Sequence, residues 1–312
     1  SPRPLPVRDN TPRLLLRGAR ANNLQNIDFS LPLGRLVCLT GVSGSGKSTL
    51  VQDVLYPALL KRLGRATEAP GEHTALLGAE RIAEVVMVDQ TPIGKTTRSN
   101  PASYVGAFDA IRKLFAAEPS ARERNYTIGT FSFNSGNGRC PTCGGNGFEH
   151  VEMQFLSDVY LRCPDCDGRR YRDEVLEIKL TRGAVQRAGG AAPSIADILE
   201  MTVAQAVEFF ANESEVLDNL RPLAEVGLDY LKLGQPVPTL SGGEAQRLKL
   251  AGHLAEQGGN RGAARTRAAA TVAEDEPLRG NLFLFDEPTT GLHFDDIAKL
   301  LRALRRLLEA GH

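Results

Sequence analysis

An apolar run that leads directly into a glycine-rich loop constrains this chain most. Residues 36–40 read LVCLT, which predicts a buried strand, and residues 41–50 read GVSGSGKSTL. The second stretch is a P-loop, in which glycines let main-chain N–H groups surround a polyphosphate where a helix begins. The alternative is a Gly/Ser-rich turn that only resembles a P-loop, and the strand-to-helix context argues against it. The pattern predicts an α/β fold.

The loop also predicts which residues bind ATP and Mg²⁺. Lys47 is expected to reach the β- and γ-phosphates, and Ser48 is expected to coordinate Mg²⁺. The other ATP-binding candidates are Gly41, Ser43, Gly44, Ser45, Gly46 and Thr49. Cys38, inside the apolar run, is expected to be a buried strand residue.

A second apolar run, residues 281–285, ends in Asp286 and Glu287. At the end of a buried strand, Asp286 is placed to hold the Mg²⁺ shell, and Glu287 can orient and deprotonate the attacking water. An isolated Asp-Glu pair is more often a solvated turn. A P-loop in the same chain makes that interpretation remote.

Residues 240–251, LSGGEAQRLKLA, predict a helix with a defined start. Ser241 and Glu244 have the spacing of a capping box. The start of the helix presents the Ser241 hydroxyl and the N–H groups of Gly242 and Gly243, which suit a γ-phosphate. One buried stripe is predicted from the spacing of Ala245, Leu248, Ala251 and Ala255.

Two matching cysteine knuckles lie between these motifs. Cys140 and Cys143 form the first C-P-x-C turn, Cys163 and Cys166 form the second, and 19 residues (144–162) separate them. Four thiolates complete a tetrahedral Zn²⁺ site and leave no open position for catalysis. Disulfides would need an oxidising compartment, yet no signal peptide is visible, and a redox C-x-x-C would need only one pair. The pattern predicts structural zinc.

The composition restricts the possible functions of the chain but does not indicate one. Lys+Arg and Asp+Glu balance at 37 each, so net charge gives no argument for nucleic acid. No apolar run approaches the roughly 18 residues that span a bilayer, so membrane work would require another subunit. We expect a cytoplasmic protein. The chain starts without Met and ends directly after an amphipathic helix pattern, which is typical of a piece of something longer.

Taken together, the motifs resemble those of ATP-binding cassette (ABC) ATPases. LSGGEAQ is similar to the ABC signature, LFLFDEPT to the acidic strand, and Gln90 in VDQTP to the Q-loop glutamine that senses the γ-phosphate and Mg²⁺. Lys47 and Ser241 are 194 positions apart (241 − 47), more than in an ordinary ABC ATPase. The surplus holds the cysteine knuckles.

An ABC ATPase with knuckles at this place is similar to the second, C-terminal half of the UvrA family, the damage-recognition ATPases of bacterial nucleotide excision repair. The resemblance covers nearly the whole chain, including DQTPIGKTTRSNP, FSFN and DEPTTGLH. It implies an α/β P-loop NTPase of ABC type with an inserted, mainly helical signature and DNA-binding domain that carries a zinc-ribbon-like β-hairpin module. The expected parts are core 1–99, inserted region 100–237 with zinc module 134–172, and core 238–312, incomplete at its C-terminus.

The resemblance also implies partners and roles. ABC sites are composite, so the chain is expected to work as a homodimer or against a second ABC half. Its expected ligand is damaged double-stranded DNA of any sequence. Glu287, Lys47 and Gln90 would be catalytic, and Mg²⁺ would be held by Ser48, Asp286 and Gln90. Contacts with UvrB belong to the other half of a full-length protein, and the ATPase is not itself a nuclease.

Basic residues near the knuckles are the DNA-binding candidates. Partial alternation in residues 151–156 predicts a β-hairpin whose base the metal clasps. Arginines that contact phosphates position a protein on a duplex without reading sequence. The candidates are Lys95, Arg98, Arg139, Arg162, Arg169, Arg170 and Arg172. The alternative for each is solvated surface or, for Lys95 and Arg98, a structural role in folding the Gln90 loop.

Three departures from the family pattern accompany the resemblance. The chain ends before the strand that carries the family's switch-loop histidine, and His312 is not that residue. Residues 258–280, rich in Ala, Arg and Gly, predict a flexible loop, similar to the enlarged loop of UvrA paralogues linked with drug tolerance. No aromatic residue stands at the usual adenine-stacking position.

Two other functions stay open. A UvrA-like drug-tolerance protein would bind DNA and use ATP as a conformational clamp. An ABC transporter ATPase subunit would share every nucleotide motif, but it should lack the zinc knuckles.

Overall fold

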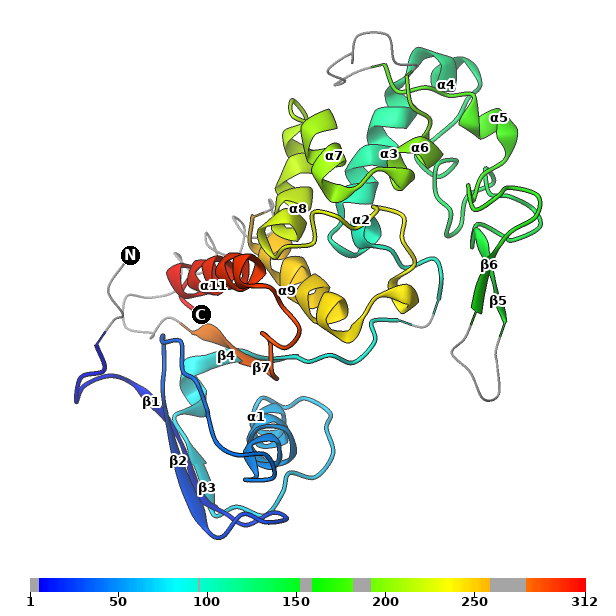
Figure 1. Ribbon diagram of the computed structural model, residues 1–312. Coiled ribbons are helices and arrows are strands. Elements are labelled where there is room, and N and C mark those ends of the chain that lie inside the picture. The colour runs from blue at the N-terminus through cyan, green and yellow to red at the C-terminus, as the bar shows by residue number, and fades with distance from the viewer. Residues whose placement is uncertain (1–5, 95, 152–158, 182–191, 259–278) are drawn as a thin grey trace. The chain divides into compact units, whose positions relative to one another are not determined.

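The computed structural model describes two compact units (Figure 1). The described residues are 6–94, 96–151, 159–181, 192–258 and 279–312. Unit 1 comprises Ser1–Asp89, Arg267–Thr290 and Leu301–His312, and unit 2 comprises Gln90–Thr266 and Gly291–Leu300. The last helix, α11 (Phe294–Glu309), therefore begins in unit 2 and ends in unit 1.

Unit 1 contains an antiparallel sheet in which β1 (Arg13–Ala19) lies between β2 (Ile27–Pro32) and β3 (Ala75–Leu77). Side chains alternate across a strand, so Leu14 and Leu16 of β1 share one face and are both buried. They belong to the same core cluster as Leu50 and Val54 of the helix that follows the P-loop. This helix consists of a π-helical segment, η1 (Thr49–Leu55), and α1 (Tyr56–Arg62).

A parallel pair of strands completes the described sheets of unit 1. β4 (Ile82–Val88), which follows the short helix η2 (Ala79–Arg81), pairs with β7 (Gly280–Phe285). The register sets Val88 opposite Phe285. The residues that follow these partners, Asp89 and Asp286, therefore leave the sheet at the same edge.

The predicted strand at residues 36–40 is wrong. These residues have no strand structure, and Leu36, Val37 and Leu39 are 54%, 41% and 39% exposed. Cys38, expected to be buried, is exposed as well. An apolar run is buried as a strand only when neighbouring strands pair with it, and β4 and β7 pair with each other in the described part of the sheet.

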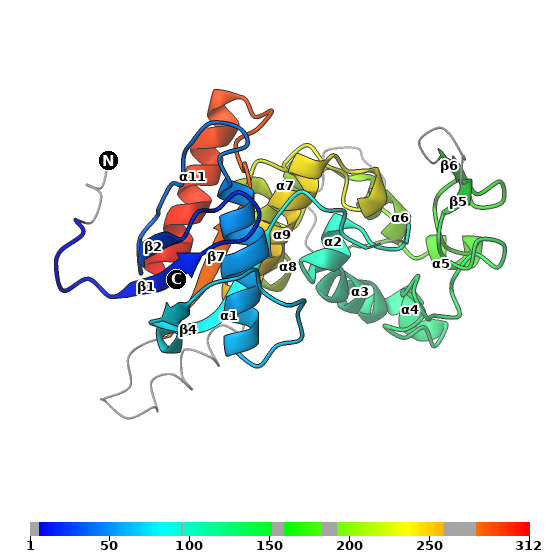
Figure 2. The same ribbon diagram turned by 90° about the horizontal axis from the view of Figure 1, so that it is seen from below.

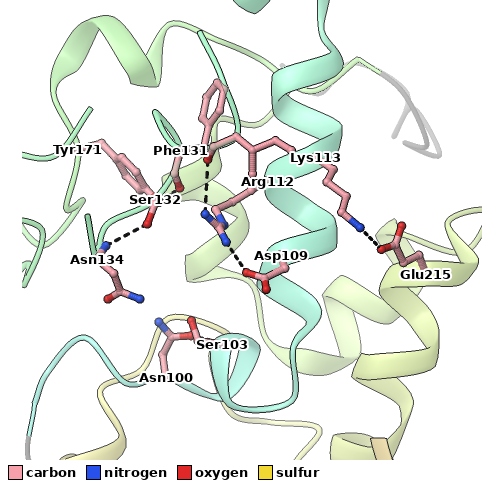
Figure 3. Close-up of polar contacts among 11 residues, drawn as sticks. Asn100, Ser103, Asp109, Arg112, Lys113, Phe131, Ser132, Asn134, Tyr171 and Glu215 are labelled. Carbon is pink, nitrogen blue, oxygen red and sulfur yellow. Dashed lines mark hydrogen bonds and ion pairs between the residues drawn. The ribbon is translucent and has the colours of Figure 1, made fainter. Parts of the chain in front are cut away.

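Unit 2 is mainly helical, as the resemblance implied. Its helices are α2 (Pro101–Tyr104), α3 (Ala107–Ala117), α4 (Pro119–Glu123), α5 (Asp173–Leu176), α6 (Ile195–Glu200), α7 (Val203–Phe209), α8 (Ser214–Glu225), η3 (Val237–Thr239) and α9 (Gly242–Gly258). α8 lies beside α3 and α9 (Figures 1 and 2). Polar contacts fix this bundle locally: Asn100 Oδ1 accepts from Ser103 N at 2.9 Å and caps α2, and Lys113 of α3 pairs with Glu215 of α8 (Figure 3).

An antiparallel hairpin lies between the knuckles, as predicted, although residues 152–156, from whose alternation it was predicted, lie outside the described residues. β5 (Phe148–Val151) and β6 (Val159–Arg162) are antiparallel, with Phe148 opposite Arg162. The two strands project from the end of unit 2 (Figures 1 and 2). Residues 259–278 of the predicted flexible loop, and Lys95, lie outside the described residues. Within the described ranges, every helix is too short or too polar to cross a bilayer.

Candidate functional site

The P-loop has the backbone that its glycines predict. Gly44 and Gly46 have φ of +76° and +90°, in the left-handed region that side chains rarely adopt. Asn23 Nδ2 donates to the carbonyl of Gly44 at 2.7 Å and so holds the loop from outside. Lys47 Nζ donates to the carbonyls of Gly41 and Val42 at 2.9 and 2.8 Å. The lysine is therefore held against the loop whose N–H groups are expected to surround the phosphates.

The rest of the loop is open to solvent. Gly41, Ser43, Ser45 and Ser48 are exposed, and Ser48 lies in the first turn of the helix. Thr49 Oγ1, one residue further, accepts from Asn22 Nδ2 at 3.4 Å. The sequence did not single out Asn22 and Asn23, which support the loop from the chain preceding it.

Asp286, the proposed Mg²⁺ residue, is fixed by a residue of the helix after the P-loop. Gln52 Nε2 donates to Asp286 Oδ2 at 2.8 Å. The adjacent Glu287 has φ of +43°, and Thr290 Oγ1 donates to its Oε2 at 3.3 Å. A non-glycine residue in the left-handed region is strained, and such strain is concentrated at functional sites. The acidic pair is thus oriented by contacts inside unit 1.

The capping box at the start of α9 is confirmed. Ser241 N and Oγ donate to Glu244 Oε2 at 2.8 and 2.9 Å, and Glu244 N donates to Ser241 Oγ at 3.4 Å. Tyr230 OH donates to the other carboxylate oxygen at 2.6 Å. Burial opposes ionisation of Glu244, but these donors and the charge of Arg247 outweigh it and lower the pKa of the carboxyl. The predicted stripe is also confirmed, since Ala245, Leu248, Ala251 and Ala255 are all buried.

Gln90, the proposed γ-phosphate sensor, packs against the signature motif of its own chain. A Cβ added to Gly242 would lie 3.1 Å from Gln90 Cβ and Oε1. Next to this contact, Lys249 Nζ of α9 donates to Thr91 Oγ1 at 2.8 Å. The Q-loop and the signature helix are therefore linked inside unit 2, a link that sequence spacing alone does not reveal.

The four cysteines converge on one point. Their Sγ atoms all lie within 4.8 Å of one another, with Cys140 and Cys163 4.0 Å apart and Cys143 and Cys166 3.7 Å apart. Tetrahedral Zn–S bonds of about 2.3 Å place neighbouring sulfurs about 3.8 Å apart, whereas a disulfide needs about 2.0 Å. Gly147 N donates to Cys143 Sγ at 3.2 Å, which stabilises a thiolate. The donor set fits Zn²⁺.

The arginine candidates separate into three groups. Arg162, Arg169 and Arg172 are exposed. Arg98 and Arg139 are partly buried and donate to main-chain or amide oxygens of the first knuckle region.

Arg170 forms the third group, and its burial contradicts the prediction that it contacts DNA. It is 2% exposed, and its guanidinium donates to three main-chain carbonyls. A buried guanidinium is not available to a duplex, so Arg170 is no DNA contact. The cause is the close packing of the second knuckle on the body of unit 2.

The sequence of this chain is similar to those of known proteins. No family model matches the chain. Over 299 residues, 96% of its length, the chain is 52% identical to UvrABC system protein A of Thermus thermophilus and 50% identical to that of Methanothermobacter thermautotrophicus. The chain belongs to the UvrA family. It spans 28% of the length of these two UvrA relatives.

A solved UvrA-family structure supports the same assignment. The crystal structure of UvrA2 from Deinococcus radiodurans matches with a TM-score of 0.80 and 44% identity, over 100% of this chain and 35% of that one. The P-loop ABC fold expected from the motifs is thus the fold of a UvrA-family segment. The four-cysteine centre is part of that segment.

Proposed function

We propose that this chain binds and hydrolyses ATP within a DNA damage-recognition ATPase of nucleotide excision repair. Lys47 and the P-loop N–H groups hold the phosphates, Ser48 and Asp286 hold the Mg²⁺ shell, and Glu287 deprotonates the attacking water. Gln90 senses whether the γ-phosphate is present. Bound Mg²⁺ supplies charge neutralisation on the phosphates, and the chain's own residues supply position and the base.

The position of the four-cysteine centre carries this proposal. It lies between Gln90 and Ser241 in sequence, and its four sulfurs are close enough to share one ion. An ABC transporter ATPase subunit is expected to lack such a centre. The relatives named UvrABC system protein A support the assignment to repair.

Core residues 1–99 and 238–312 would carry the nucleotide chemistry, and residues 100–237 would relay nucleotide state to DNA. The exposed Arg162, Arg169 and Arg172 are the proposed contacts to duplex phosphates, which makes recognition independent of sequence. UvrB would be met only through the other half of a longer protein.

ATP hydrolysis with intact and lesion-bearing duplex tests the proposal. Glu287→Gln removes the base but keeps the size of the side chain, so kcat should fall by about 100-fold or more while ATP still binds. The exposed Glu309→Gln at the end of α11 is the matched control and should hydrolyse ATP at the wild-type rate. Equal wild-type rates with and without damaged DNA would count against coupling to DNA.

A mixing experiment tests whether the site is shared between two copies. A Lys47→Ala copy lacks the P-loop lysine, and a Ser241→Arg copy blocks the signature helix. If sites form between copies, each variant alone is inactive, but a mixed dimer contains one intact site, and an equal mixture should recover about a quarter of wild-type activity. No recovery on mixing, with dimers formed, would contradict a site shared between identical copies.

A further inference from the structure

The buried Arg170 lies where three segments of unit 2 meet. Its Nη2 donates to the carbonyls of Thr97 at 3.0 Å and Gly234 at 3.1 Å, and its Nη1 donates to Gly145 at 3.4 Å. Thr97 is seven residues after Gln90 (97 − 90), and Gly234 is seven residues before Ser241 (241 − 234). One guanidinium therefore joins three parts of the chain: the first knuckle, the segment that follows the Q-loop, and the segment that precedes the signature helix.

The same side chain is enclosed by aromatic rings. The Arg170 guanidinium carbon lies 5.1 Å from the ring centre of Phe133 and 5.9 Å from that of Phe148. The next residue, Tyr171, is buried, and its hydroxyl donates to the carbonyl of Phe131 at 2.8 Å (Figure 3). The aromatic contacts and the hydrogen bond of the neighbouring Tyr171 restrict the movement of the buried guanidinium.

Charge balance links this position to the metal. The three acceptors of the Arg170 side chain in the described structure are neutral carbonyls, whereas the exposed Arg162 and Arg169 pair with Asp167 and Asp173. A buried cation is costly unless a negative charge lies nearby. Four thiolates around Zn²⁺ carry a net charge of −2 (−4 + 2), and the main-chain N–H of Arg170 donates to one of them, Cys166 Sγ, at 3.4 Å.

We propose that Arg170 is a positioning residue through which zinc occupancy holds the segment after Gln90 and the segment before Ser241 together. The zinc centre supplies negative charge, to which the carboxylate of Glu200, itself paired with Lys232 at 2.7 Å, adds. The guanidinium carries the effect of the centre to both carbonyls. This inference requires zinc in the centre, but it does not depend on the repair function.

Two backbone amides bond between the segment after Gln90 and the segment before Ser241, so their hydrogen exchange reports on whether these two segments stay together. Val237 N donates to the carbonyl of Ser99 at 2.8 Å, and Ala102 N donates to that of Leu233 at 3.2 Å, so both bonds join the same two segments. Hydrogen exchange at Val237 and Ala102, measured with and without a zinc chelator, tests the proposal. In the wild type, zinc removal should accelerate both amides by about tenfold or more.

In Arg170→Met with zinc bound, hydrogen exchange at both amides should be faster than in the wild type, by about the same factor as zinc removal produces. Adding the chelator to this variant should then increase the exchange rate by less than about twofold, because the substitution and the loss of zinc disrupt the same linkage. Arg162→Gln, which removes an exposed arginine of the same zinc module (residues 134–172), should behave as the wild type in both conditions. Arg170→Lys keeps the charge but not the fork that reaches several carbonyls, so exchange should be intermediate with full zinc content.

Zinc content of each variant separates misfolding from loss of coupling. Wild-type exchange at both amides after zinc removal would overturn the proposal, and so would wild-type exchange in zinc-loaded Arg170→Met. If Arg170→Met does not retain zinc, Arg170→Lys decides, and unchanged exchange at Val237 and Ala102 in that variant overturns it. None of these measurements involves DNA or ATP, so a failed repair assay leaves them interpretable.

Discussion

Gln52 Nε2 donates a hydrogen bond of 2.8 Å to Asp286 Oδ2 across 234 positions of sequence. The bond joins the helix that follows the P-loop to the end of β7. It orients the carboxylate that we assign to Mg²⁺, with a donor that no nucleotide motif contains. Gln52 is four residues after Ser48 (52 − 48), so it lies on the same face of the helix, and that spacing is the signal by which sequence reasoning could have found it.

Gln52→Leu should therefore raise the Mg²⁺ concentration for half-maximal ATP hydrolysis by about tenfold, because a hydrogen bond to a charged group contributes about 1.5–3 kcal/mol. ATP binding measured without Mg²⁺ should stay at the wild-type level. The matched control is Gln235→Leu, a half-buried glutamine of unit 2 whose side-chain amide donates to Thr239 Oγ1 at 3.4 Å. An unchanged Mg²⁺ requirement in Gln52→Leu would mean that Asp286 does not depend on this contact.

Substitutions at two P-loop glycines distinguish the effect of backbone strain from that of steric conflict. Gly44 and Gly46 both have positive φ, but a Cβ on Gly44 meets nothing within 4 Å, whereas on Gly46 it lies 2.8 Å from Leu24 Cδ2 and 2.9 Å from Asn23 Oδ1. Gly44→Ala should cost about 1–2 kcal/mol of loop stability. Gly46→Ala adds the displacement of Asn23, which holds the loop, so its ATP affinity should fall further, by about tenfold relative to Gly44→Ala. Titration with a fluorescent ATP analogue measures both, and equal affinities would contradict the steric argument.

The sequence predicted the motifs of this chain better than their surroundings. The capping box of Ser241 and Glu244 and the four-cysteine cluster were predicted because local spacing determines them. The strand at residues 36–40 was not, because burial of a strand depends on partners that lie elsewhere in the chain. Arg170 was misassigned for the same reason: an arginine beside exposed arginines has the same local pattern whether it faces solvent or the carbonyls of Thr97 and Gly234.

The carboxyl of Glu244 gives the start of α9 a dependence on acid. Its pKa is lowered in the folded protein, since the donors outweigh the opposing effect of burial. A lowered folded-state pKa contributes stability above the unfolded value, about 4.5, and that stability is lost as pH falls through the lower folded value. Urea unfolding from pH 6 down to pH 3 should thus show an acid loss in the wild type that is smaller in Glu244→Gln. A parallel pH dependence of both proteins would exclude this contribution.

The exposed arginines of the zinc module should act on DNA through charge alone. Arg162 and Arg172 are exposed, whereas Arg170 is buried, so Arg162→Gln and Arg172→Gln should each weaken duplex binding equally for all sequences. Each lost phosphate contact should reduce the slope of log affinity against log salt by about 0.9. Arg170→Lys should leave that slope unchanged, because the residue does not reach solvent.

Binding measured by fluorescence anisotropy at several salt concentrations gives the slopes. A wild-type slope in the Arg162→Gln, Arg172→Gln double variant would place the DNA surface away from these two arginines, since counterions are released only where phosphates are contacted.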